Sequence, residues 1–198
     1  MRSAIAVLGL LLLAGCAPTP TVDESTPGAS PTPSATVTTA PVDEVFAMPT
    51  ACLDIVPPSR LAEFDADGLV LLGGPDGLYG DDYLLDPSPE QQLGGVTCIW
   101  GPPDTEVSSV AISVAPLSAA DRPAVVTDLS VSQGLNESIG EADTYYWKIG
   151  DSDDHPAILN VLTDDSWISV IQTIGGTDGY AAAEKLAAEV RALVYTVN

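Results

Sequence analysis

The sequence changes character near residue 50, and only the part that follows has the composition of a hydrophobic core. From Ala17 to Thr50 the chain holds seven prolines, eight threonines and three serines, and its only charges are four acidic residues. Such a segment buries too little apolar surface to offset the entropy lost on ordering, so residues 16–50 are predicted to form a disordered tether. Residues 51–198 are long enough for a single domain with a core.

The first fifteen residues have the three parts of a secretory signal: positive Arg2, an apolar run from Ala4 to Leu13, and small residues before Cys16. That run is too short for a mature membrane helix, which needs about 20 residues. Its end, Leu13-Ala14-Gly15-Cys16, resembles the lipobox of bacterial lipoproteins. The resemblance implies that residues 1–15 are removed, that Cys16 carries acyl chains such as palmitate, and that the protein is anchored extracytoplasmically to the cell membrane.

The charge of the domain excludes two classes of partner. Residues 51–198 contain 24 acidic and 5 basic residues, a net charge of −19. No Lys or Arg cluster is available to neutralise phosphates, so we expect binding neither to nucleic acid nor to anionic lipid headgroups. Solubility in a saline exterior is the simplest explanation of this acidity.

Two cysteines remain once Cys16 is assigned to lipid. Cys52 and Cys98 would lie in an oxidising compartment, so we expect them to form a disulfide. Closing a loop of this length stabilises a fold by about 4 kcal/mol in the chain-entropy model. Two thiols and a single histidine do not supply a four-ligand zinc site, and no Cys-x-x-Cys redox motif is present. We expect no cofactor and no metal.

Hydrophobic periodicity predicts an α+β domain. A short helix is expected after Pro57, then a long loop over 65–95 with at most a short strand at 69–72. Alternation over 109–114 predicts a strand with one face in the core and the other exposed to water. A helix is expected from Asp121 to Gly134. The predicted strands span 96–100, 110–114, 144–149, 157–162 and 167–173.

The last two of these strands are expected to form a hairpin, and a terminal helix capped by Asp178 is expected to follow, with Lys185 and Arg191 on its exposed side. The resulting order is a short helix followed by β-β-α-β-β-β-α. It predicts a mostly antiparallel sheet with helices packed on one face. This element order is similar to the PsbP/Mog1-like arrangement.

Three features together resemble a family of actinobacterial lipoproteins of unknown function. They are the lipobox, the opening Ala51-Cys52-Leu53 before a short helix, and Cys98-Ile99-Trp100. In that family a Cys-x-Leu-Leu opening is followed by Cys-x-Trp, and an amphipathic helix closes the domain. This chain departs at the opening, where Asp54 and Ile55 stand in for the usual leucine pair. Because the family has no established activity, the resemblance implies fold and location only.

Few residues suggest chemistry. His155 is the only histidine, and no Gly-x-Ser-x-Gly turn accompanies it, so no Ser-His-Asp system is expected. Three aspartate clusters offer oxygen ligands suited to calcium, but none has the EF-hand spacing. These clusters are Asp151, Asp153 and Asp154; Asp65 and Asp67; and Asp76, Asp81 and Asp82.

The best candidate for a binding surface is Tyr145-Tyr146-Trp147, whose aromatic rings suit a sugar or a peptide. In a strand, Tyr145 and Trp147 share one face and Tyr146 takes the other, and one of these faces is expected to be core.

We therefore expect a non-enzymatic lipoprotein whose domain binds an envelope protein or a cell-wall component, or supports a surface complex. One alternative is the solute-binding lipoprotein of an importer, which usually needs two lobes; converging polar groups in a deep cleft would favour it. Another is a cell-wall hydrolase, which two carboxylates about 5 to 10 Å apart in a groove would favour. A flat patch edged by aromatic rings would favour the non-enzymatic binding lipoprotein.

Overall fold

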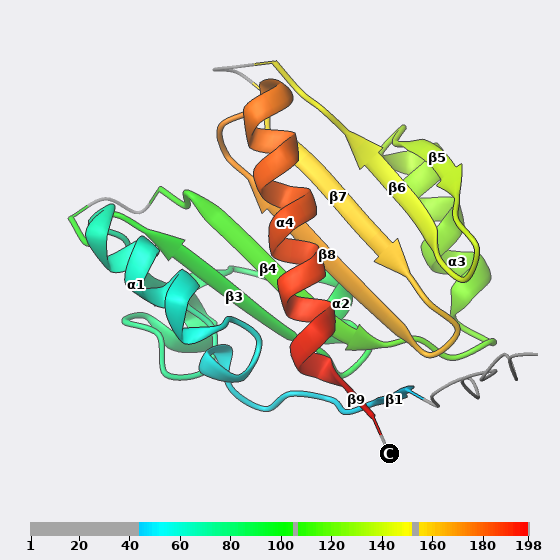
Figure 1. The fold of residues 1–198 in the computed structure, drawn as a ribbon, viewed down its shortest axis with the longest axis horizontal. Helices are drawn as coiled ribbons and strands as arrows, with labels where there is room; N and C mark the ends of the chain where they lie inside the picture. The colour runs from blue at the N-terminus through cyan, green and yellow to red at the C-terminus, as the bar shows by residue number, and fades with distance from the viewer. Residues whose placement is uncertain (1–43, 105–106, 152–154, 198) are drawn as a thin grey trace, which may run out of the picture. The chain divides into compact units, whose positions relative to one another are not determined.

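A seven-stranded antiparallel sheet organises the folded part of the chain (Figure 1). The computed structural model describes residues 44–104, 107–151 and 155–197, which belong to a compact unit beginning at Pro41. The expected lipobox with Cys16, and most of the expected tether, lie outside the described residues. Within the described part of the chain, no helix is both long and apolar enough to span a membrane.

The strand order across the sheet is β2-β3-β4-β8-β7-β6-β5, and each neighbouring pair runs antiparallel. All five strands expected from the sequence are present, as β3, β4, β6, β7 and β8. The bounds of the seven strands are β2 (Val70–Gly73), β3 (Val96–Gly101), β4 (Val110–Pro116), β5 (Asn136–Ile139), β6 (Thr144–Lys148), β7 (Ala157–Leu162) and β8 (Ser166–Gln172).

The hairpin between β7 and β8 forms where it was expected. Leu162 pairs with Trp167, and the backbone N–H of Ser166 donates to the Thr163 hydroxyl at 2.9 Å, which closes the turn. Short β5 escaped prediction because Asn136–Ile139 is exposed throughout and has no buried face to mark it.

Helices cover both faces of the sheet, which corrects the expectation that they pack on one face. On one face lie α1 (Pro58–Ala66) and α4 (Gly176–Val194); on the other lie α2 (Pro89–Gln92), α3 (Arg122–Thr127) and its π-helical continuation η3 (Asp128–Ser132). The reason lies in the central strands. Ile168 packs in the core beneath α4, and its neighbour Trp167 packs in the core beneath α3. Apolar residues on both faces need cover on both faces.

The stripe of buried residues in α4 confirms the amphipathic helix, but its start differs from the prediction. Gly175 is the N-cap, Gly176 adopts a φ of 81° that favours glycine, and Asp178 lies inside the first turn. Arg191 is not on an exposed side: it is about one-third exposed and forms an ion pair with Asp143 of the segment before β6.

The folded part begins earlier than the expected boundary at Ala51. Strand β1 (Glu44–Phe46) pairs with β9 (Tyr195–Val197) at the end of the chain, and the Phe46 and Tyr195 rings lie 5.7 Å apart. Met48 also packs against the core. Composition averaged over 17–50 hides the short apolar run at the end of that segment, so the sequence alone places the start of the fold too late.

The expected loop over 65–95 contains more structure than its Gly, Asp and Pro content suggested. It includes β2, the 3₁₀ turn η2 (Gly80–Tyr83) and α2. The short helix α2 is built by a capping box: the Ser88 hydroxyl accepts from the Gln91 N–H, and the Gln91 side chain accepts from the Ser88 N–H. Pro89 occupies its first turn.

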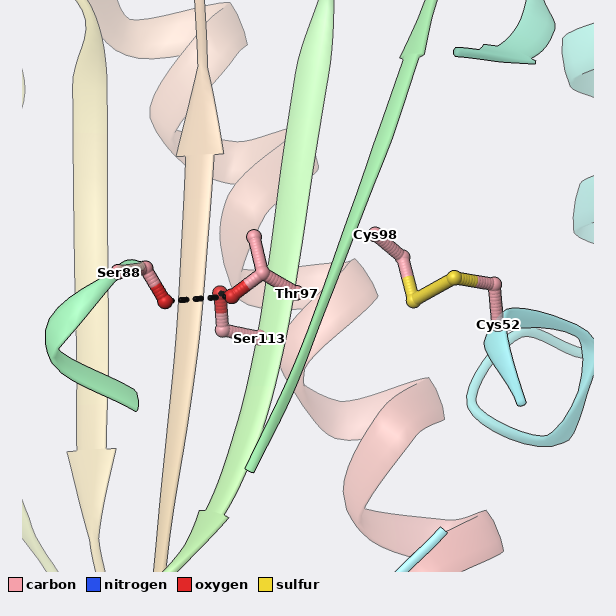
Figure 2. The surroundings of a disulfide bond; sticks show 5 residues. All are labelled: Cys52, Ser88, Thr97, Cys98 and Ser113. Carbon is pink, nitrogen blue, oxygen red and sulfur yellow. Dashed lines mark hydrogen bonds between the residues drawn. A yellow bond between two sulfur atoms is a disulfide. The ribbon is translucent and has the colours of Figure 1, made fainter. Parts of the chain in front are cut away.

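The disulfide between Cys52 and Cys98 is present, as expected. It joins the 3₁₀ turn η1 (Cys52–Asp54) to β3, with the Cα atoms 5.5 Å apart and both residues fully buried (Figure 2). It lies on the α4 side of β3, beside Phe64 of α1 and Trp100. The bridge thus attaches the entry of the chain to the second strand of the sheet.

Candidate functional site

A row of polar side chains crosses the sheet on the face opposite α4. The register places Thr97 of β3 opposite Ser113 of β4, and Ser113 opposite Ser169 of β8. Ser169 in turn lies opposite Asn160 of β7. All four residues are at most 5% exposed. Buried polar groups cost free energy unless they are hydrogen-bonded, so a row of them in the middle of a sheet is a candidate for function.

Two separate sets of hydrogen bonds hold the two ends of this row. The Ser88 and Thr97 hydroxyl oxygens lie 2.6 Å apart, and the Thr97 and Ser113 oxygens 3.0 Å apart. Figure 2 shows these hydroxyls on the side of β3 opposite the disulfide. Farther along, Trp167 Nε1 donates to Asn160 Oδ1 at 2.9 Å, and Asn160 Nδ2 donates to the Tyr146 carbonyl at 3.4 Å.

The row lines a pocket of about 230 Å³, called here the polar pocket. The pocket has space because the side chains of Ala111, Ser113 and Ser169 are small, whereas their neighbours on the same face of the sheet are larger. Ile99, Ile158 and Ile171 supply an apolar wall, and residues of α2 together with Gln133 complete the lining. Ile171 is 37% exposed and Gln133 is exposed, so the pocket opens to solvent along that rim.

Glu90 is the one carboxylate among the described residues that line the polar pocket. It follows Pro89 in the first turn of α2, and its side chain is turned inward so that the residue is only 6% exposed. Burial raises the pKa of Glu90, and hydrogen bonds from its own backbone and from the Ser88 and Ser169 hydroxyls oppose that rise. The charge of nearby Asp128 raises it further.

A second cavity, of about 390 Å³, lies between α4 and the strands β6 and β7. Its wall is largely apolar and includes Tyr145, Leu159 and Tyr180. Its charged residues are Asp143, Glu184 and Arg191; Arg191 pairs with Asp143, one oxygen of which, Oδ1, is buried without a hydrogen-bond partner. The polar pocket is smaller, but more of its polar groups converge.

The aromatic residues singled out in the sequence are divided between the two faces, as the period of two predicts. Tyr145 lines the cavity beneath α4, and Trp147 packs on Tyr180 with ring centres 5.6 Å apart. Tyr146 is 1% exposed on the other face and its hydroxyl donates to Glu137 at 2.8 Å. Burial, together with Glu137, raises the pKa of Tyr146 to about 12. Both faces of β6 are thus covered.

The remaining candidates lie apart from the polar pocket. His155 Nδ1 lies 2.9 Å from Asp151 Oδ1, and both side chains are more than half exposed. Asp153 and Asp154 fall outside the described residues, as does Cys16. Within residues 44–104, 107–151 and 155–197, no three His, Cys, Asp or Glu side chains gather closely enough to hold a metal ion.

The polar pocket was missed because strand patterning assigns alternating serines to a water-exposed face. Ser113 was expected there and is 5% exposed instead. A signal was nonetheless present: Ser169 stands between Trp167 and Ile171 on the same face of β8, and Asn160 between Ile158 and Leu162 on β7. A polar residue flanked in this way by large apolar ones indicates a buried polar position. Glu90 carried no comparable signal.

No protein-family model matches this chain, and a search of curated proteins found none that matches it. The function is therefore inferred from its own residues.

Proposed function

We propose that this protein is a lipid-anchored extracytoplasmic binding protein whose domain holds a small ligand in the polar pocket and catalyses no reaction. The observation that carries the proposal is the convergence of five polar residues, each at most 6% exposed, on one hollow: Glu90, Thr97, Ser113, Asn160 and Ser169. Converging polar groups in a concave site are typical of small-molecule recognition. The lipobox resemblance and the buried disulfide support the location.

The lining of the polar pocket supports binding over catalysis. Its described residues include no histidine, the commonest general base, and no lysine or cysteine, and its hydroxyls hydrogen-bond to one another. Hydrolysis of a glycoside by the usual route needs two carboxylates across the bond, and Glu90 is the one that the described lining supplies.

Docking of an envelope partner on an aromatic surface receives less support. Tyr145 and Trp147 face α4, and Tyr146 is buried on the opposite face. A small-solute site therefore fits the geometry better than a flat aromatic patch, although the pocket belongs to one domain rather than to a cleft between two lobes.

Matched substitutions in the two cavities test the proposal. We expect Ala111→Leu to fill the polar pocket, and Ala188→Leu to narrow the cavity beneath α4 by the same side-chain change. The lipidated protein is purified from native membranes and analysed by native mass spectrometry for a small molecule that copurifies. A111L should lose that molecule and A188L should retain it. The reverse pattern, or an unliganded wild type, would contradict the proposal.

A further inference from the structure

We propose that the ligand of the polar pocket is a small organic cation, held by the Glu90 carboxylate as its counter-ion and by serine hydroxyls as hydrogen-bond acceptors. This inference rests on the binding function proposed above and adds the chemical class of the ligand.

The first argument is charge. Glu90 is 6% exposed, and the described residues lining the polar pocket include no Lys, Arg or His. A buried carboxylate stays ionised only when hydrogen bonds or a positive charge compensate for lost hydration. The Ser88 and Ser169 hydroxyls supply hydrogen bonds, but the positive charge is missing from this lining. A cationic ligand supplies it, and an anionic ligand is repelled.

The second argument is the direction of the hydroxyl protons. A hydroxyl has one proton to donate, so when Glu90 is ionised Ser88 donates to its carboxylate and must accept from Thr97. Thr97 has then used its proton and must accept from Ser113. Ser169 likewise donates to Glu90. What Ser113 and Ser169 have left for a ligand is lone pairs, which suit the N–H groups of an ammonium.

The other polar groups of the pocket fit the same ligand. Gln133 Nε2 donates to Asp128 at 2.8 Å, which leaves the Gln133 side-chain oxygen as an acceptor. Asn160 keeps a second amide proton after donating to the Tyr146 carbonyl, so the pocket is acceptor-rich rather than free of donors.

The third argument is size and shape. A cavity of about 150 Å³ binds benzene, and the polar pocket measures about 230 Å³. It therefore has room for one ring together with a short aminoalkyl group. Ile99, Ile158 and Ile171 offer apolar surface for the hydrocarbon part of such a ligand. The net charge of −19 on residues 51–198 attracts cations toward the domain from a distance.

The proposal implies that protons compete with the ligand. Asp128 of η3 is the charged group that faces Glu90 from a neighbouring element, while β3, β4 and β8 contain no charged residue within their bounds. Asp128 and burial both favour protonated Glu90, and a bound cation favours its ionised form. Affinity for a cation should therefore fall as pH drops below the pKa of Glu90, by up to about tenfold for each pH unit.

The test compares benzylamine with benzyl alcohol on the full mature chain in detergent, by isothermal titration calorimetry from pH 4 to pH 8. The two probes have nearly the same shape and differ in charge. At pH 7 we expect benzylamine to bind at least about tenfold tighter than benzyl alcohol. Its affinity should fall in acid, while that of the alcohol stays flat. Glu90→Gln should abolish the preference, and the exposed Asp164→Asn, which removes the same charge elsewhere, should preserve it.

The outcomes separate this inference from the proposed function. Three results would overturn the proposal of a cationic ligand. They are equal affinity for both probes, a pH-independent affinity for benzylamine, and an unchanged preference for benzylamine in E90Q. If a copurifying molecule is displaced by A111L but is uncharged, the binding function stands and the ligand class is wrong. The comparison of probes uses the unaltered protein, so it decides the matter even where E90Q does not fold.

Discussion

At the scale of single residues, Asn160 shows how the polar row is held inside an apolar sheet. Its side-chain oxygen accepts from Trp167 Nε1 and its amide donates to the Tyr146 carbonyl, so one residue satisfies two other buried groups. Trp167 and Tyr146 are among the largest fully buried side chains of the domain. The Trp167 ring is therefore held by this amide, whereas the ring of Tyr146 is held through its hydroxyl, which donates to Glu137.

Replacing Asn160 by alanine should cost stability through the group that it leaves unpaired. We expect N160A to lower the free energy of unfolding by about 2 kcal/mol, because Trp167 Nε1 loses its acceptor in a buried site. Asn136→Ala is the matched control: Asn136 also donates to a backbone carbonyl, that of Trp147, but is exposed. It should cost less than about 0.5 kcal/mol. Urea unfolding measures both free energies, provided that the curves have equal slopes. Equal losses of stability in N160A and N136A would refute the role of the unpaired Trp167 Nε1.

At the scale of elements, the fold is a sheet whose two faces serve different purposes. The α4 face carries the larger core, with Ile112, Ile168 and Val190 fully buried. The opposite face carries a smaller core beneath α3 and, next to it, the polar pocket beside α2. The disulfide sits on the α4 face, so it stabilises the sheet from the side away from the pocket.

Removing the disulfide should therefore weaken the fold without changing the pocket chemistry. We expect Cys52→Ala with Cys98→Ala to lower the free energy of unfolding by about 2 to 5 kcal/mol, because the unfolded chain regains the freedom of a closed loop. Thermal unfolding of the oxidised wild type, the reduced wild type and the double variant is the measurement. The reduced wild type should melt close to the variant. A variant as stable as the oxidised protein would show that the bridge contributes nothing.

At the scale of the whole molecule, the proposed anchor and the folded domain belong to one chain whose described part begins with β1. Pairing of β1 with β9 joins the end of the tether to the end of α4, and Arg191 lies within 3.7 Å of Glu44 in β1. The first described residues are thus held by the C-terminal segment of the domain.

Lipidation at Cys16 is tested in cells. We expect an alkyne analogue of palmitate to label the wild type and the Cys52→Ala variant, but not Cys16→Ser. An inhibitor of lipoprotein signal peptidase should leave an uncleaved precursor of the wild type, which blotting detects. Labelling of C16S, or normal processing under the inhibitor, would refute the lipid anchor.

The sequence by itself determined the α+β class, the five central strands, the amphipathic terminal helix and the Cys52–Cys98 bridge. Each of these follows from local spacing or from a forced pairing, since Cys52 and Cys98 have only each other if Cys16 carries lipid in an oxidising compartment, as expected. Only the tertiary structure decided that both sheet faces are covered and that Thr97, Ser113 and Ser169 are buried. A period of two divides a strand into two faces, but what packs on each face depends on residues far away in the chain. The lipobox-like Leu13-Ala14-Gly15-Cys16 is such a local pattern, whereas the polar pocket exists only where β3, β4, β7, β8 and α2 meet.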